Sequence, residues 1–312
     1  MLYMRLQGGL GNQLYTYSFG KALSAYLGVE LVLDLFDFGV RKYEDGTPYK
    51  WAYFMGGLNI PERVATEEEF DRLENSLQDK EICVYKPLLF PYIKELYGKS
   101  PNKTTFCVSL MGDDWRYHEP VVNALREQLT PLPVANGSRD LMWEIRSSES
   151  IGMHIRLGDY TTTLECLVLP KQYYHDCLTI LRRSTCNPRV YVFTDSPDMV
   201  RGQIEGDIPI TLVEGNDPVT DMALLSACKH KIIANSSFSF WAARLDGRKG
   251  GITLAPETYF LPINKHKDVP PPSYPPEWRV VPVRFPDGYI EELLQWEREK
   301  NKAVEEFNGI VP

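Results

Sequence analysis

The chain is 312 residues long, with 43% hydrophobic residues and a formal net charge of −8. This length accommodates one large domain or two of moderate size, and the hydrophobic content suits a globular core. The acidic balance argues against general affinity for nucleic acid or anionic membranes, because phosphate-backbone binding relies on a basic surface. The sequence contains neither a signal-like leader nor an apolar run of about 18 residues, so we expect a cytoplasmic protein without a transmembrane segment. The scattered cysteines, without close pairing, suggest neither a zinc site nor a disulfide framework.

The N-terminal part of the chain predicts a β–α–β unit. Residues 2–6 are apolar and rich in strand formers, residues 13–27 have helical spacing, and residues 29–35 match a buried strand. A glycine-rich turn joins the first strand to the helix.

That turn lies within the stretch GGLGNQLYTYSFG. Gly9 and Gly11 fit the beginning of a dinucleotide fingerprint, but Leu14 follows where the third glycine is missing, so this match is weak. A simple strand-to-helix turn is a second interpretation. It does not explain the carboxamides of Asn12 and Gln13, which with free backbone N–H groups could hold a phosphate or sugar hydroxyls.

The middle of the chain, residues 36–136, is less regular. Helices are predicted at 65–77 and 119–129, and strands at 81–86 and 104–112.

The pattern sharpens after residue 138, where strands and helices alternate. The predicted strands are 150–157, 189–195, 209–215, 229–235 and 251–256, and the predicted helices are 170–183, 196–204, 217–228 and 236–245. Because each crossover must return over a sheet face, this alternation predicts an α/β fold with a doubly wound parallel sheet. In such sheets ligands bind beyond the carboxyl ends of the strands.

We expect three segments in the chain. Residues 1–138 form an N-terminal Rossmann-like domain, residues 139–262 form a second one, and residues 263–312 form a tail. Within the tail, residues 267–288 are too rich in proline to predict regular structure, and residues 289–307 predict an amphipathic helix.

The end of the strand at 150–157 places a cation beside a turn. His154 and Arg156 are two residues apart, so they lie on the same face of a strand, and the arginine fork suits a diphosphate. Gly158 and Asp159 then form a turn with a carboxylate. The alternative is a strand-end salt bridge between Arg156 and Asp159, which by itself would be of little consequence.

Two further strand ends carry polar side chains. Asn235, Ser236 and Ser237 precede a helix and exceed what one N-cap needs, so they could bind phosphate. Phe238 belongs to the same helix start, although an aromatic side chain there also suits the core. Asp195 ends the strand at 189–195 and could accept N–H donors from guanine or bond a ribose hydroxyl, or it could be a plain N-cap.

Five motifs together carry a resemblance to a known family. They are GGLGNQLYTYSFGKALS, HIRLGDY, VYVFTDSP, DMALLSACKHKIIANSSFSFWAARL and ITLAPETYF, and they occur in order between residues 4 and 260. In this set the sequence resembles the bacterial-type α-1,2-fucosyltransferases of glycosyltransferase family 11.

The resemblance implies a GT-B fold, in which two Rossmann-like domains face a central cleft and the N-terminal domain lies on the acceptor side. It also implies GDP-β-L-fucose as donor, galactose O2 of a glycan as acceptor, inversion to an α-1,2 linkage, and no metal or other cofactor. The absence of an Asp-x-Asp motif from the sequence supports the last expectation.

The resemblance also implies roles for single residues. Arg156 would hold the β-phosphate with His154, Asn12 and the Ser236 helix as partners, and Asp159 would be the base. The predicted catalytic residues are therefore Arg156, His154 and Asp159, and the predicted donor-binding residues are Gly11, Asn12, Gln13, Asp195, Asn235, Ser236, Ser237 and Phe238.

Other features leave alternatives open. Glu165 and Asp113 or Asp114 are further candidates for the base. Leu157 stands where the family usually has a second arginine, and on a strand it would point away from Arg156. The stretch LMGDDWRYHEP departs from the family, so the acceptor is poorly constrained, and the residues after 260 extend beyond the expected family end.

Three rival functions are weighed against this one. The nearest is transfer from GDP-fucose to another hydroxyl, or from another GDP-sugar. The more distant ones are a dinucleotide-binding oxidoreductase and a non-catalytic saccharide-binding protein. The oligomeric state is not predicted by the sequence.

Overall fold

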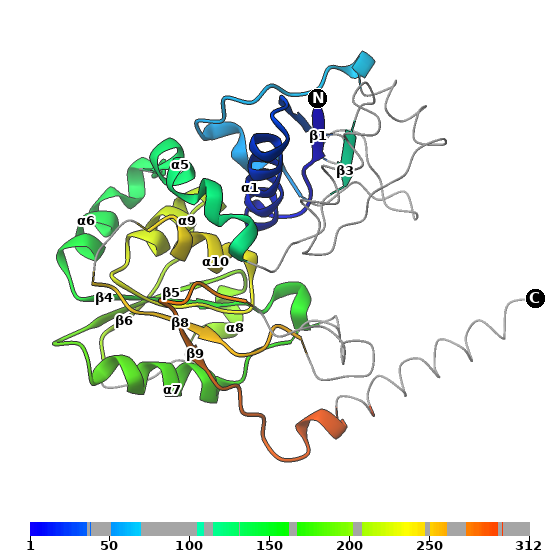
Figure 1. Cartoon of the computed structure of the whole chain (residues 1–312). Coiled ribbons are helices and arrows are strands. Elements are labelled where there is room, and N and C mark those ends of the chain that lie inside the picture. Colours follow the sequence, from blue (N-terminus) through cyan, green and yellow to red (C-terminus); the bar gives the residue numbers. More distant parts are fainter. Residues whose placement is uncertain are drawn as a thin grey trace, which may run out of the picture.

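The computed structural model describes residues 1–35, 38, 51–69, 105–108, 115–130, 132–161, 167–201, 208–246, 250–260, 273–292 and 295, with the backbone alone for 105–108. Within these ranges the strands form two parallel sheets, which confirms the predicted α/β class. Figure 1 shows the smaller sheet and its helix above the larger sheet.

The smaller sheet has the strand order β2-β1-β3. Strand β1 (Leu2–Arg5) leads through the glycine turn into α1 (Leu10–Leu27), and β2 (Leu31–Asp34) and β3 (Thr105–Val108) pair with β1 in parallel. The predicted β–α–β unit is confirmed. Helix α1 is buried on nearly all sides of its first three turns because it is apolar around its circumference.

The larger sheet has the order β6-β5-β4-β7-β8-β9, and every pair is parallel. Its strands are β4 (Ser150–Ile155), β5 (Arg189–Thr194), β6 (Ile210–Leu212), β7 (His230–Ile232), β8 (Thr253–Pro256) and β9 (Arg279–Val281). Strand β4 lies at the centre, where the strand order reverses, and this is the position at which doubly wound sheets bind ligands.

Helices cover both faces of this sheet (Figure 1). Helix α7 (Lys171–Arg182) lies on one face, and α6 (Arg139–Ser147), α9 (Pro218–Ala227) and α10 (Ser237–Arg244) lie on the other. The remaining helical elements are α5 (Glu119–Leu129), α8 (Pro197–Val200) and the 3₁₀ turns Phe54–Gly57, Trp115–Tyr117, Asn136–Ser138 and Gly158–Thr161.

Some sequence-based expectations need correction, and others fall outside the described residues. The prediction that residues 267–288 lack regular structure is wrong, because β9 pairs with β8 and extends the sheet. Helix α6 was not predicted. The predicted strand at 81–86 and most of the predicted helices at 65–77 and 289–307 lie outside the described residues.

The two sheets are joined through helix–helix contact between α1 and α10. A Cβ atom on Gly11 would lie 2.3 Å from the backbone nitrogen of Phe238 and 2.5 Å from the carbonyl carbon of Ser237. Glycine at this position therefore lets the backbone of α1 approach the first turn of α10. Further along the same contact, the Tyr15 and Phe240 rings stack with centroids 4.9 Å apart.

Candidate active site

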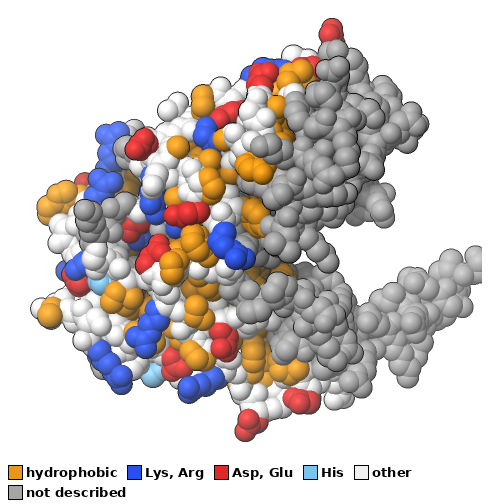
Figure 2. Space-filling view, viewed as in Figure 1, with side chains coloured by type: hydrophobic (Ala, Val, Ile, Leu, Met, Phe, Trp, Pro, Cys, Tyr) orange, Lys and Arg blue, Asp and Glu red, His pale blue; other side chains and the backbone are white. Residues whose placement is uncertain are grey.

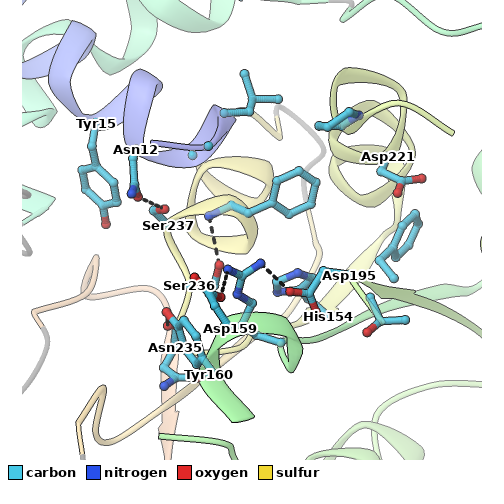
Figure 3. A pocket seen from close by; sticks show the side chains of 18 of the residues that line it. Asn12, Tyr15, His154, Asp159, Tyr160, Asp195, Asp221, Asn235, Ser236 and Ser237 are labelled. Atoms are coloured by element: carbon cyan, nitrogen blue, oxygen red, sulfur yellow. Dashed lines mark hydrogen bonds and ion pairs between the residues drawn. The ribbon is translucent and has the colours of Figure 1, made fainter. Parts of the chain in front are cut away.

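A cavity of ≈ 660 Å³ opens at the carboxyl ends of β4 and β5. Its walls come from the start of α1, the 3₁₀ turn Gly158–Thr161, the start of α10 and a segment around Trp51. Figure 3 shows the side chains of α1 and α10 meeting those that follow β4. The motifs singled out in the sequence therefore lie around one cavity.

Arg156 is the first residue after β4 and is held between two carboxylates. Its Nη2 lies 2.5 Å from Asp159 Oδ1, and its Nη1 lies 2.5 Å from Asp195 Oδ2. The Tyr160 ring centroid is 5.0 Å from the Arg156 guanidinium carbon. The salt bridge between Arg156 and Asp159, given above as the alternative interpretation, is present. Arg156 also pairs with Asp195, so its guanidinium links the end of β4 to the end of β5. A diphosphate bound to the two terminal nitrogens of Arg156 would put phosphate oxygens where the carboxylate oxygens now lie.

The neighbouring residue Leu157 faces the other way, as expected. Its side chain packs against the apolar cluster around α7, whereas its backbone N–H donates to Asp195 Oδ1 at 3.0 Å. The arginine usual at this position would therefore meet apolar neighbours instead of the cavity.

His154 is almost fully buried on β4, with a side chain that lines the cavity. Burial, with a smaller contribution from the nearby Arg156 cation, lowers the His154 pKa to about 3. Its Nδ1 has no hydrogen-bond partner among the described residues, and its ring centroid is 5.3 Å from that of Phe238. His154 is thus neutral near pH 7 and offers a polar ring nitrogen without adding positive charge.

The start of α10 combines capping and cavity-lining side chains. Ser236 is the N-cap and accepts a hydrogen bond from the Phe238 N–H at 3.3 Å, which confirms the capping interpretation for this residue. The Asn235 amide donates to the Leu167 and Tyr259 carbonyls at 2.8 and 2.9 Å. The side chains of Asn235, Ser236 and Phe238 all line the cavity.

Asn12 and Ser237 connect α1 to α10 across the cavity wall. The Ser237 hydroxyl donates to Asn12 Oδ1, and both side chains line the cavity (Figure 3). Gly11 also lines it, with its Cα against the α10 backbone.

Gln13 does not fit its predicted role in donor binding. Its side chain is fully buried, and its Nε2 donates to the Gly8 and Ala52 carbonyls at 2.8 Å each. Its Oε1 accepts from the Phe54 N–H at 3.0 Å. Both amide hydrogens are therefore used within the protein, and the role of this residue is to fasten the segment at 52–54 to α1.

The chain matches the model of Glycosyl transferase family 11 over residues 73–281. It belongs to this family. The match extends past residue 260, so the expectation that the family ends there is wrong, and it includes β9. As a family 11 glycosyltransferase the protein is an enzyme, which removes the oxidoreductase and non-catalytic alternatives.

Two similar proteins from Escherichia coli match most of this family 11 glycosyltransferase. An α-1,2-colitosyltransferase is 31% identical over 273 residues, which cover 82% of this chain and 91% of the relative. The O-antigen biosynthesis glycosyltransferase WbnK is 25% identical over 314 residues, covering 85% and 97%.

More distant similarities are also found. The galactoside α-(1,2)-fucosyltransferase 2 of Oryctolagus cuniculus is 28% identical over 207 residues, covering 62% of this chain and 55% of the relative. The solved structure of the α-1,6-fucosyltransferase NodZ with GDP has a TM-score of 0.45 and 17% identity, and covers 78% of this chain and 91% of NodZ. A likeness this distant assigns no activity.

Sequence analysis of this glycosyltransferase missed one carboxylate in the cavity. Asp221, in the first turn of α9, lines the cavity and accepts a hydrogen bond from Asn216 Nδ2 at 2.9 Å. Burial, with repulsion from Asp217 as a smaller cause, raises the pKa of Asp221 to about 6. The sequence carries a signal for it, because Asp221 lies shortly after the predicted strand at 209–215, and ligands bind beyond such strand ends.

Glu165, Asp113 and Asp114 lie outside the described residues. Within the described ranges, no three His, Cys, Asp or Glu side chains gather as metal ligands. The described helices include none that is long and apolar enough to span a membrane.

Proposed function

We propose that the enzyme transfers L-fucose from GDP-β-L-fucose to galactose O2 of a glycan acceptor, with inversion to an α-1,2 linkage. The observation that carries this proposal is the position of Arg156, which faces the cavity beside the first turn of α10. A guanidinium and a helix N-terminus together suit a diphosphate, because both offer directed N–H donors to anionic oxygens. The names of the α-1,2-colitosyltransferase and α-(1,2)-fucosyltransferase relatives support the linkage.

We assign the fold to the GT-B type on the same grounds. Two parallel sheets with a cavity lined from both are the arrangement that this type requires. The N-terminal unit would be residues 1–138, and the donor domain would begin at 139 and continue through β9 instead of ending at 262.

In the proposed reaction an acceptor hydroxyl attacks fucose C1 while GDP leaves from the opposite face. Negative charge grows on the β-phosphate as the C1–O bond breaks, so Arg156 and the α10 N–H groups stabilise the transition state more than the ground state. Neutral His154 would orient the phosphate and would add no second positive charge beside Arg156. Asp159 remains the proposed base that takes the acceptor proton.

The main rival concerns the sugar of the donor. A relative is named as a colitosyltransferase, and colitose is L-fucose without its 3-hydroxyl. A screen of GDP-fucose, GDP-colitose, GDP-mannose, UDP-galactose and NAD, measuring binding and acceptor-free hydrolysis, tests the proposal. Selective hydrolysis of GDP-fucose supports it, and equal or greater use of GDP-colitose or GDP-mannose overturns the donor assignment.

GDP is expected to bind without a divalent metal. Arg156 and the α10 N-terminus would neutralise the diphosphate where a metal otherwise would. Calorimetry in EDTA and then in manganese should give the same GDP affinity within about twofold. Binding that disappears in EDTA and returns with manganese would contradict the expectation.

Two of the cavity carboxylates, Asp195 and Asp221, are expected to have different roles in donor binding. Asp195→Ala should raise the donor KM much more than the acceptor KM, since Asp195 anchors Arg156 and is predicted to contact the guanosine.

For Asp221 we expect contact with the N1–H and 2-amino edge of guanine. Asp221→Asn should therefore reduce the preference for GDP over IDP, which lacks the amino group, by about tenfold.

The pH dependence separates the Asp221 assignment from a structural role. The accepting form is the carboxylate, and the Asp221 pKa is about 6, so GDP affinity should fall as the pH is lowered through this value. Asp221→Asn should flatten that profile. An unchanged GDP preference together with an unchanged pH profile would remove Asp221 from guanine binding.

A further inference from the structure

Two kinds of chemistry meet in the cavity. The strand ends after β4 and β5 supply the charged side chains of Arg156, Asp159 and Asp195. Trp51 and Phe54 add aromatic side chains from the N-terminal part of the chain. These two rings come from the segment between β2 and β3 of the smaller sheet, and no motif identified it in the sequence. We define Trp51 and Phe54 as the aromatic wall.

The aromatic wall is fixed to α1 by the protein itself. Gln13 binds the Ala52 carbonyl and the Phe54 N–H, so a single buried amide holds both sides of this segment. Met55, the next residue, is fully buried in the main apolar core. A segment anchored by a buried amide and a core side chain presents its rings in a defined position.

The Trp51 ring lies directly on the backbone of Gly9. A Cβ atom on Gly9 would lie 3.2, 3.5 and 3.6 Å from three ring carbons of Trp51. The Gly9 backbone has φ −72° and ψ 174°, which any residue can adopt. The shortest of these distances is tight and the other two are ordinary contacts, so a methyl group here would displace the indole slightly. The ring lies at the N-cap of the helix that also brings Asn12 to the cavity.

We propose that the aromatic wall binds the acceptor sugar, as a platform for the apolar face of a β-galactoside. In galactose, the axial 4-hydroxyl leaves C–H groups of C3, C4 and C5 on one face, and an electron-rich indole suits such a face. Sugar sites combine this surface with a few directed polar groups, which the other cavity walls supply. The inference rests on the proposed function, because it takes a galactoside as acceptor.

Trp51→Ala tests the platform. With methyl β-D-galactoside as acceptor, we expect the acceptor KM to rise about tenfold, since one aromatic contact is lost. Trp51→Phe should recover most of this loss. The affinity for GDP and the acceptor-free hydrolysis of GDP-fucose should stay unchanged in both variants, because the proposed contacts to the donor are made by other side chains, namely Arg156, Asp195 and Asp221.

A double-mutant cycle with Gly9 provides a second measurement that does not depend on removing the ring. Gly9→Ala should displace the indole by a few tenths of an ångström and raise the acceptor KM a few fold in the wild-type background. In the Trp51→Ala background it should have no further effect. Gly57→Ala is the matched control, since its Cβ would meet no atom within 4 Å.

The outcomes separate this inference from the proposed function. If GDP-fucose is hydrolysed normally but Trp51→Ala leaves the acceptor KM unchanged, the platform is wrong and the donor assignment stands. If methyl β-D-galactoside neither binds nor accepts fucose, the acceptor class is wrong. If GDP-fucose is not used by the wild-type enzyme, the proposed function itself fails.

Discussion

A folded Arg156→Lys variant is expected to lose about a hundredfold in kcat for fucosyl transfer, which corresponds to about 3 kcal/mol of transition-state stabilisation. Arg156 uses its two terminal nitrogens separately, one toward Asp159 and one toward Asp195. Lysine keeps the charge but has a single nitrogen, so it cannot span two acceptors in one plane. If a diphosphate binds both terminal nitrogens of Arg156, the lysine variant loses one of the two hydrogen bonds to it.

A matched arginine provides the control. Arg201 also pairs with two carboxylates, Asp198 at 3.5 Å and Glu214 at 2.6 Å, but it is 60% exposed and does not line the cavity. Arg201→Lys should leave kcat unchanged, because exposed ion pairs contribute under about 1 kcal/mol to stability. If the Arg156→Lys enzyme keeps most of its kcat, Arg156 has no role in the chemical step, and its ion pairs with the two carboxylates are structural.

The meeting of distant motifs in one cavity was predictable because it follows from topology. Carboxyl ends of neighbouring parallel strands lie at the same edge of a sheet, and β4 is flanked by β5 and β7. Arg156, Asp195 and Ser236 each follow one of these strands, so their proximity needed only the order of the elements.

The function of single polar side chains was harder to predict, because it depends on partners far away in the sequence. Gln13 binds Ala52 and Phe54, which lie in a stretch without a periodic pattern. The neighbouring sequence does not distinguish a carboxamide that binds a ligand from one that binds the protein backbone, because the same N–H donors and carbonyl oxygen can bond either partner. The same limit explains why Trp51 was missed.

Strand β9 was missed for a different reason. Its residues, Arg279–Val281, lie between Pro276 and Pro282, and this composition suggested irregular structure. The prolines flank the strand without interrupting it, and β9 is at the edge of the sheet, where proline is tolerated because one side of the strand needs no ladder hydrogen bonds.

Gly11→Ala is expected to lower the free energy of unfolding by about 3 kcal/mol, at the upper end of what overpacking costs. The added methyl group would meet the Ser237–Phe238 backbone at 2.3 to 2.5 Å, and a backbone cannot rotate away as a side chain can. Helices α1 and α10 would have to separate, which disturbs the Asn12–Ser237 hydrogen bond between them. Urea denaturation measures the loss, and the donor KM should rise in whatever fraction stays folded.

Gly137→Ala is the control for that measurement, because its Cβ would meet no atom within 4 Å. It should change the free energy of unfolding by less than about 0.5 kcal/mol. The pair also distinguishes two explanations for glycine in the GGLGNQ turn. If Gly11 served only to expose backbone N–H groups to a ligand, Gly11→Ala would weaken GDP binding at normal stability. Since the methyl group instead meets protein backbone, stability should fall first, and an unchanged unfolding curve would show that the close approach of α1 and α10 is not required.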